Sequence, residues 1–258
     1  MHHSCNQTFL ADIGMMKNPR TVSAVTQSVA DTVEAAAKQG SLPLTIGGDH
    51  SLALGTLSGT LRQRPEAGVI WVDAHSDINT PETTKSGNLH GCPVSFLLGL
   101  KGTAVEPFSS WVKPLLKPDS IVFIGLRDVD AGERKILREN NIKCFTMHHI
   151  DRYGIGNVVE MALDYLNGFK GKWDRPIHLS FDIDALDPTV APSTGTPVRG
   201  GLTEREGFCV CEMLAETGCL VGVDVMEVNP SLMESNHAEQ TVTVACGLAR
   251  SAVGETLL

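Results

Sequence analysis

The sequence has no long apolar run, no regular cysteine spacing and no excess of basic residues. None of its apolar stretches approaches the roughly 20 residues that a membrane-spanning helix needs, and Met1–Gln7 has neither the apolar core of a signal peptide nor a basic amphipathic leader. The seven cysteines are odd in number, and Cys209 and Cys211 are too close together for a zinc-finger pair. These features predict a soluble cytoplasmic protein in a reducing compartment, with no membrane partner.

The charge balance and the length limit the class further. The chain has 21 basic and 30 acidic residues, a net charge of -9, which argues against nucleic acid as a partner and mildly favours cationic ligands. Its 258 residues, 42% of them hydrophobic, are enough for one sizeable core. Because no internal repeat, low-complexity tract or linker divides the chain, we expect a single domain over residues 1–258.

Apolar segments that end in polar residues recur along the chain and alternate with helical patterns. The expected strands are Leu42–Ile46, Gly68–Val72, Ile121–Gly125, Pro176–Phe181 and Leu220–Met226. The expected helices are Thr21–Lys38, a helix starting near Ser51, Ala131–Asn140, Gly156–Leu166, Thr203–Thr217 and about Ala238–Val253. This alternation predicts an α/β fold, a three-layer α-β-α sandwich with a mostly parallel sheet. In such sheets the active site lies at the C-terminal ends of the strands.

Carboxylates and imidazoles follow three of these strands. They are found in Asp73-Ala-His75-Ser-Asp77, in Asp182-Ile-Asp184, and at His50, which follows Gly47-Gly48-Asp49. If the chain stays extended past the strand, alternate residues point the same way, so the first run can converge. A lone Asp after a strand is commonly a helix cap, but six such groups together need a compensating charge, because burying uncompensated charge is costly.

A pair of divalent metal ions would provide that compensation. The predicted ligands are His50, Asp73, His75, Asp77, Asp182 and Asp184. Four carboxylates and two imidazoles without a nearby thiolate favour Mn(II) over structural zinc. Bridging carboxylates can hold two ions about 3.5–4 Å apart and lower the pKa of a shared water. The residues alone therefore predict a hydrolytic two-metal site without specifying its substrate.

Five separated motifs resemble the arginases of the ureohydrolase family. They are Gly47-Gly-Asp-His-Ser51, Asp73-Ala-His-Ser-Asp-Ile-Asn79, Ser86-Gly-Asn-Leu-His-Gly91, Ser180-Phe-Asp-Ile-Asp-Ala-Leu-Asp-Pro188 and Met226-Glu-Val-Asn-Pro230. The resemblance extends from about Lys17 onward, and the terminal Gly254–Leu258 is more similar to fungal arginases than to animal ones. It implies hydrolysis of L-arginine to L-ornithine and urea by a hydroxide that bridges two Mn(II) ions. In the family pattern, the first ion would bind His50 and Asp77, and the second would bind His75 and Asp184. Asp73 and Asp182 would bridge the two ions.

The resemblance also implies roles for residues beyond the ligands. Glu227 would anchor the guanidinium group and His90 would be the proton shuttle, with Asp77 counted among the catalytic residues. Read from the residues alone, His90 is equally compatible with capping a loop beside Gly91. The substrate-end residues implied by the family are Asn79, Ser86 and Asn88 for the α-carboxylate, Asp130 and Glu133 for the α-amino end, and Thr196 lining the site. Taken singly, Ser and Asn in a loop are usually turn formers.

The sequence leaves two alternatives to an active arginase open. The first is a related guanidine hydrolase acting on agmatine or guanidinobutyrate. Arginases normally begin with a further strand and a glycine-rich loop that this chain lacks, so we expect truncation relative to the family, an open strand edge and an exposed apolar surface. The chain could then be a catalytically inactive subunit. If it is active, the resemblance implies a homotrimer, with Arg205, Glu206 and Arg250 at the positions of subunit contacts.

Overall fold

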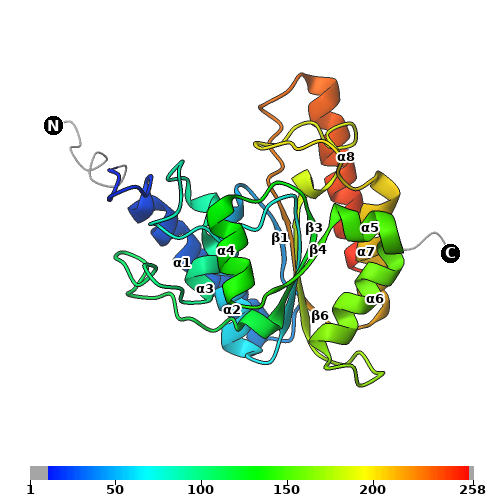
Figure 1. Ribbon diagram of the computed structural model, residues 1–258, viewed down its shortest axis with the longest axis horizontal. Helices are drawn as coiled ribbons and strands as arrows, with labels where there is room; N and C mark the ends of the chain where they lie inside the picture. The colour runs from blue at the N-terminus through cyan, green and yellow to red at the C-terminus, as the bar shows by residue number, and fades with distance from the viewer. Residues whose placement is uncertain (1–10, 256–258) are drawn as a thin grey trace.

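The chain folds around one parallel sheet that lies between two layers of helices (Figure 1). The computed structural model describes residues 11–255. Within that range the six strands are β1 (Leu44–Ile46), β2 (Gly68–Val72), β3 (Ile121–Leu126), β4 (Lys143–Thr146), β5 (Ile177–Asp182) and β6 (Leu220–Met226). Their order across the sheet is β1-β6-β5-β2-β3-β4, and every neighbouring pair is parallel. The predicted three-layer α/β fold is confirmed.

The helices divide between the two faces of the sheet. Figure 1 shows α1 (Pro19–Lys38), α2 (Ala53–Gln63), α3 (Pro93–Leu97) and α4 (Ala131–Glu139) on one side, and α5 (Met147–Tyr153), α6 (Ile155–Leu166), α7 (Glu204–Glu216) and α8 (Ser235–Ala252) on the other. None of the described helices is long and apolar enough to cross a membrane.

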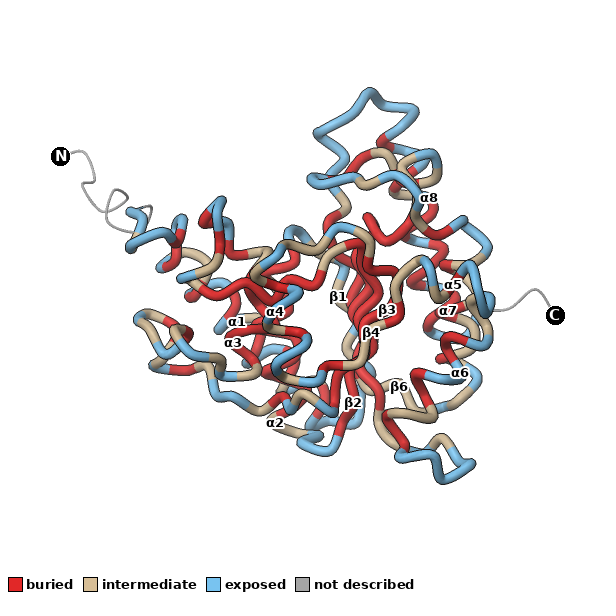
Figure 2. Tube along the Cα trace, viewed as in Figure 1, coloured by how far each residue is buried: buried red, intermediate tan, exposed pale blue. Residues whose placement is uncertain are grey.

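Two hydrophobic cores lie back to back across the sheet. In β2, Ile70 and Val72 pack into the core beneath α6, α7 and α8, whereas Val69 and Trp71 pack into the core with α2 and α3. Side chains alternate between faces, so a strand that is covered on both sides must be apolar at every position. This is why β2 and β3 are continuous apolar runs and why the centre of the sheet is buried in Figure 2.

The sequence pattern did not predict the five-residue helix α3, the strand β4 or the helix α5. Within residues 11–255 the strand β4 pairs with β3 alone, at one border of the sheet, and its Lys143 and Cys144 are half-buried. The following helix α5 has seven residues, two of which are His148 and His149. An edge strand with a charged residue and a helix of two turns lack the long periodic patterns on which the prediction depends.

The opposite border, β1, carries an exposed apolar surface. Leu44 and Ile46 are 42% and 58% exposed, although they align with the buried Val223 and Val225 of β6. Among the described residues β1 pairs with β6 alone, so one side of its backbone is open. The exposed apolar surface expected from the sequence is thus present at this edge.

The sheet order decides where the predicted site residues meet. The strands β6, β5 and β2 are neighbours, and each is followed at its C-terminal end by a predicted site residue. Glu227 follows β6, Asp182 ends β5, and Asp73 follows β2. Because parallel strands end on the same border, side chains more than a hundred residues apart in sequence are brought together there.

Candidate metal centre

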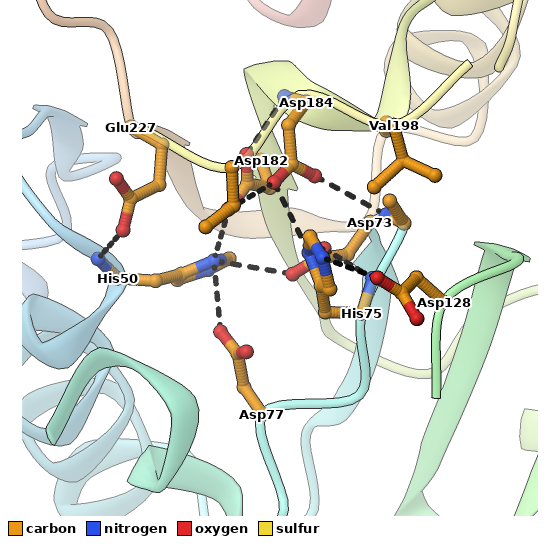
Figure 3. A network of polar contacts seen from close by, with 12 residues as sticks. His50, Asp73, His75, Asp77, Asp128, Asp182, Asp184, Val198 and Glu227 are labelled. Atoms are coloured by element: carbon orange, nitrogen blue, oxygen red, sulfur yellow. Dashed lines mark hydrogen bonds and ion pairs between the residues drawn. The ribbon is translucent and has the colours of Figure 1, made fainter. Parts of the chain in front are cut away.

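Two overlapping groups of potential ligands lie at this border of the sheet (Figure 3). In each group the ligand atoms all lie within 4.8 Å of one another. The first group is His50, Asp73, Asp77 and Asp182, and the second is Asp73, His75 and Asp184. Asp73 belongs to both, so one carboxylate lies between two candidate ion positions.

The first group surrounds one nitrogen of His50. His50 Nδ1 lies 3.0 Å from Asp182 Oδ2, 3.3 Å from Asp73 Oδ2 and 3.5 Å from Asp77 Oδ2. All four side chains are almost completely buried. One imidazole nitrogen and three carboxylate oxygens therefore converge on a site closed to bulk solvent.

The second group surrounds Nδ1 of His75. This atom lies 3.1 Å from Asp184 Oδ2 and 3.4 Å from Asp73 Oδ1. Asp182 directs its Oδ2 to His50, while its Oδ1 accepts a hydrogen bond from the Asp184 amide at 2.7 Å. The six predicted ligands thus lie together, and the structure places Asp182 in the first group and not in the second.

The first acidic run converges by a different backbone path from the one that we expected. The extended path predicted for residues 73–77 is wrong, because the chain bends directly after β2. The His75 amide donates to Asp73 Oδ1 at 2.7 Å, and Asp77 takes a left-handed φ of 47°. Asp adopts this conformation more readily than most residues, so a turn replaces the extended segment and still directs three side chains inward.

The buried charges shift one another's proton affinities strongly. Burial alone would lower the pKa of His50, but its hydrogen bond with Asp73 and the charges of Asp77 and Asp73 outweigh that effect and raise it to about 9. For His75, burial is likewise outweighed by the hydrogen bonds with Asp184 and Asp73, and its pKa is raised to about 12. Burial and the neighbouring carboxylate charges raise the pKa of Asp77 and of Asp182.

These shifts show how much negative charge is gathered around the two imidazoles. Four carboxylates in such close proximity repel one another unless positive charge lies between them. The ligand atoms are imidazole nitrogens and carboxylate oxygens, the donors that Mn(II) and similar divalent ions accept. The residues therefore fit a pair of divalent cations, which would displace the protons on binding.

Two further side chains orient the candidate ligands and were not predicted from the sequence. Ser180 Oγ lies 2.8 Å from His50 Nε2, which leaves Nδ1 directed at the carboxylates. Trp71 donates from Nε1 to Asp73 Oδ2 at 2.8 Å and stacks on the His50 ring at 4.1 Å between centroids. Each precedes a ligand by two residues on its own strand, so the strand period was the available signal.

Glu227 and His90 form a second pair next to the ligand groups. Glu227 Oε1 accepts a hydrogen bond from the His50 backbone amide at 2.8 Å and lies 3.1 Å from His90 Nδ1. The hydrogen bond with Glu227 raises the pKa of His90. Both residues line a cavity of about 320 Å³ that also reaches Asn88 and Asp49.

The backbone at Glu227 is strained. Its φ is 62°, a left-handed conformation that costs a glutamate free energy. The Glu227 amide is fixed by a hydrogen bond to the Gly48 carbonyl at 2.9 Å, which links it to the turn before His50. Residues held in such conformations cluster at functional sites, so the strain is a reason to assign Glu227 a function.

The residues predicted for the far end of a substrate lie in two adjacent loops. The Asn79 side chain accepts from Thr83 Oγ1 at 2.8 Å and hydrogen-bonds Asp130. Asn88 lines the cavity with His90. Ser86 Oγ accepts from the Asn88 amide at 3.2 Å.

Glu133 and Thr196 are held by contacts within the chain. Both carboxylate oxygens of the buried Glu133 accept backbone amides, from Asp130 at 2.9 Å and from Ile78 at 3.4 Å. Thr196 Oγ1 donates to Asp184 Oδ2 at 3.1 Å. Glu133 therefore connects the start of α4 to the segment that carries Asp77, and Thr196 contacts a candidate ligand directly.

A larger cavity lies away from the ligand groups. It has a volume of about 930 Å³ and lies between α4, β4 and α5, with Arg134, Arg138 and Lys143 among its lining residues. No member of either ligand group lines it. Size alone is therefore a poor guide to the chemistry of this molecule.

The residues predicted for subunit contacts are bonded within the chain; Arg205 and Arg250 are exposed, and Glu206 is half-buried. Arg205 forms an ion pair with Glu212, and Arg250 pairs with Glu255 at 3.2 Å. Glu206 closes the capping box of α7 with Thr203.

Comparison with known proteins agrees with the site. The model of the arginase family matches residues 2–254. The chain belongs to the arginase family.

The similar proteins are arginases, and their alignments cover nearly the whole of this chain. The arginase of Glaciozyma antarctica is 66% identical over 249 residues, which are 96% of this chain and 71% of the relative. The arginase of Neurospora crassa is 58% identical over 252 residues, 94% of this chain and 69% of the relative.

Solved structures of arginases share the fold. The crystal structure of the cold-adapted Glaciozyma antarctica arginase has a TM-score of 0.81 at 61% identity, covering 93% of this chain and 79% of that one. The Entamoeba histolytica arginase, solved in complex with L-ornithine, has a TM-score of 0.84 at 32% identity, covering 95% of this chain and 80% of that one. The hydrolase family predicted from the motifs is thus confirmed.

Proposed function

We propose that this protein hydrolyses L-arginine to L-ornithine and urea with two Mn(II) ions per chain. The observation that carries the proposal is the shared carboxylate of Asp73, which joins two ligand groups beside the Glu227–His90 pair. His50, Asp77 and Asp182 would hold one ion, and His75 and Asp184 the other. Two ions, when bound, supply the Lewis acidity that lowers the pKa of a water molecule toward neutrality.

Glu227 is the group suited to the guanidinium end of the substrate. A carboxylate matches the planar N–H fork of a guanidinium by parallel hydrogen bonds. Glu227 Oε2 lies on the side of Gly195, where an added Cβ would be 3.6 Å away, so a larger residue there would crowd this oxygen. The His50 amide holds Oε1 in place, and the guanidinium carbon would then be bound beside the ligand groups.

His90 is the group suited to proton transfer. Its hydrogen bond with Glu227 raises its pKa, so the ring holds a proton near neutral pH more readily than a free histidine. Nδ1 is engaged by Glu227, which leaves Nε2 as the ring nitrogen for delivering a proton to the departing amine. The departing amine is the δ-amino group of ornithine, and this residue therefore completes the hydrolysis.

The identity of the substrate is supported by the far end of the site and by the relatives. An α-amino acid carries a carboxylate and an ammonium, and the adjacent loops present amide, hydroxyl and carboxylate groups in Asn79, Ser86, Asn88 and Asp130. The Entamoeba histolytica relative binds L-ornithine, the product expected here.

The deciding experiment compares urea release from L-arginine and from agmatine after incubation with MnCl2. We expect activity that depends on added metal and a kcat/KM for L-arginine far above that for agmatine. A preference for agmatine would reassign the enzyme to another guanidine hydrolase. Urea release from neither substrate by protein that has bound two ions would refute a guanidine hydrolase function.

The metal and the assembly are part of the same proposal. Mn(II) should restore more activity to chelator-treated protein than Zn(II), since oxygen-rich ligand sets favour it. We also propose a homotrimer in the cytoplasm, with Arg205, Glu206 and Arg250 at its contacts. The six cysteines of the described residues are all free thiols, which is compatible with a reducing compartment. Light scattering during gel filtration measures the assembly, and a monomer mass would refute the trimer.

A further inference from the structure

Lys85 and Asp130 form an ion pair at the far end of the candidate site. Lys85 Nζ lies 2.9 Å from Asp130 Oδ1, and the pair joins the loop after β2 to the start of α4. The same Asp130 accepts a hydrogen bond from the Asn79 side chain. Asn79 lies two residues after the ligand Asp77, so the ion pair is connected to the metal site through a short segment.

The backbone that carries Lys85 is fixed, whereas its side chain is mostly exposed to solvent. The Thr80 amide donates to Thr83 Oγ1 at 2.9 Å, and the Gly87 amide donates to Thr84 Oγ1 at 3.1 Å. The Gly87 carbonyl accepts from the Lys17 amide at 2.9 Å. The Lys85 side chain, by contrast, is 79% exposed. It can therefore change partners without any rearrangement of the loop.

A substrate with an amino acid head would offer such a change of partners. Its ammonium has the charge of Lys85 and can replace it on Asp130, while its carboxylate can accept from the freed Lys85. A ligand that has the ammonium and lacks the carboxylate would compete for Asp130 and leave Lys85 without a partner. The pair thus distinguishes a zwitterion from a simple amine.

We propose that Lys85 is a specificity-determining residue that binds the α-carboxylate of the substrate when the α-ammonium takes its place on Asp130. This inference rests on the proposed arginase function. The adjacent Ser86 and the nearby Asn88 and Asn79 supply neutral hydrogen-bonding groups, and Lys85 is the cation among them. It therefore supplies the long-range attraction for a carboxylate that those groups lack.

An ion pair that served only to hold the surface together would behave differently. Exposed pairs contribute little to stability, and both loops here are already fixed by their own hydrogen bonds. Lys135 provides a matched control, because it is an exposed lysine on α4 whose partner is Glu139, 3.8 Å away. The two lysines differ in position and not in chemistry.

The test uses Lys85→Gln, Lys85→Arg and Lys135→Gln in the full chain loaded with Mn(II), with two readouts. The first is the ratio of kcat/KM for L-arginine to that for agmatine. The second is the ratio of the dissociation constants of putrescine and L-ornithine, measured by calorimetry, which does not require turnover. We expect Lys85→Gln to lower both ratios about fivefold at low salt, mainly through KM. Lys85→Arg should retain most of each ratio, and Lys135→Gln should leave both unchanged.

The outcomes separate this inference from the proposed function. Unchanged ratios in Lys85→Gln, or an equal fall in Lys135→Gln, would overturn the role of Lys85 even in an active arginase. Loss of ornithine discrimination in Lys85→Gln would support it even if the wild type released no urea, an outcome that would refute the proposed function alone. Raising the salt concentration should reduce the wild-type ratios toward those of Lys85→Gln, because screening weakens exposed charges.

Discussion

The ligand groups and the far-end loops lie on the same border of the sheet but are held in opposite ways. Asp73, Asp182 and Asp184 are at most 2% exposed, and their carboxylates lie close to the other buried ligand groups. Lys85 and Asp130 project from loops fixed by their own backbone, and their side chains are 79% and 40% exposed. Removing a buried group leaves its partners uncompensated, whereas removing an exposed one leaves water in its place. We therefore expect substitutions to have large effects at the metal end and small effects at the far end.

The largest effect is expected from Asp73→Asn. This change removes the carboxylate common to both groups, so metal content should fall from two ions to fewer than one per chain. Loss of one partner from a buried ionic site costs about 3–5 kcal/mol, and urea release should fall at least about a thousandfold. Elemental analysis together with a urea assay measures both. Asp151→Asn, at an exposed position on α5, is the control and should retain two ions.

Glu227→Gln should separate turnover from metal binding. The amide keeps the shape of the side chain and an oxygen for the His50 amide but loses the charge that binds a guanidinium. We expect two ions to be retained and kcat/KM for L-arginine to fall about three hundredfold. Unchanged turnover in this variant would rule out the assigned role of Glu227.

The pH dependence of metal affinity tests the proton-holding state of the buried site. His50, with a pKa of about 9, and His75, with a pKa of about 12, are protonated at neutral pH and must lose a proton to bind a metal. The raised pKa of Asp77 acts in the same direction. Between pH 8 and pH 6, the affinity of each Mn(II) position should therefore weaken by at least about a hundredfold, one factor of ten per pH unit for the one histidine proton displaced at that position. Calorimetry should also detect proton release, and an affinity independent of pH would contradict this account.

His90→Asn should have an intermediate effect, because His90 lies between the two regions. It contacts Glu227 beside the ligand groups and lines the same cavity as Asn88. Loss of the proton shuttle should lower kcat about fiftyfold with metal content unchanged. Added imidazole should recover part of the rate. A rate equal to the wild type would favour the alternative in which His90 only caps its loop.

The smallest effect is expected from Asn88→Ala at the far end. This residue lines the cavity with His90, and loss of one hydrogen bond to a substrate carboxylate should raise KM for L-arginine about fivefold with little change in kcat. Agmatine turnover should be unaffected. Asn236→Ala, at an exposed position on α8, is the control. A loss of metal in Asn88→Ala would contradict the separation of the two regions.

The sequence predicted those parts of the molecule that depend on strand order and strand ends. Apolar runs followed by Asp73, Asp182 and Glu227 indicated a parallel sheet, and parallel strands necessarily bring such residues together. The left-handed backbone of Asp77 was not predicted, because the same three candidate ligands in five residues are compatible with a turn and with an extended segment. Among the described residues the edge strand β4 pairs with β3 alone, and most of its side chains are half-buried. It therefore lacks a continuous apolar pattern.

Contacts between distant side chains were beyond the reach of the sequence. The stacking of His50 on Trp71 depends on how β2 packs against the turn before α2, which no local pattern specifies. The same holds for Glu133. The structure shows it in a capping box three residues after Asp130, and its burial against the Ile78 amide follows from the approach of two loops. Local chemistry was thus predictable, and the orienting contacts required the tertiary structure.

The most direct test of the two-ion site is a titration of the metal-free wild-type chain with Mn(II), followed by elemental analysis after removal of unbound metal. Asp73 joins two ligand groups, so the account predicts two ions per chain in the wild type. Fewer than one ion per chain in folded wild-type protein would contradict it.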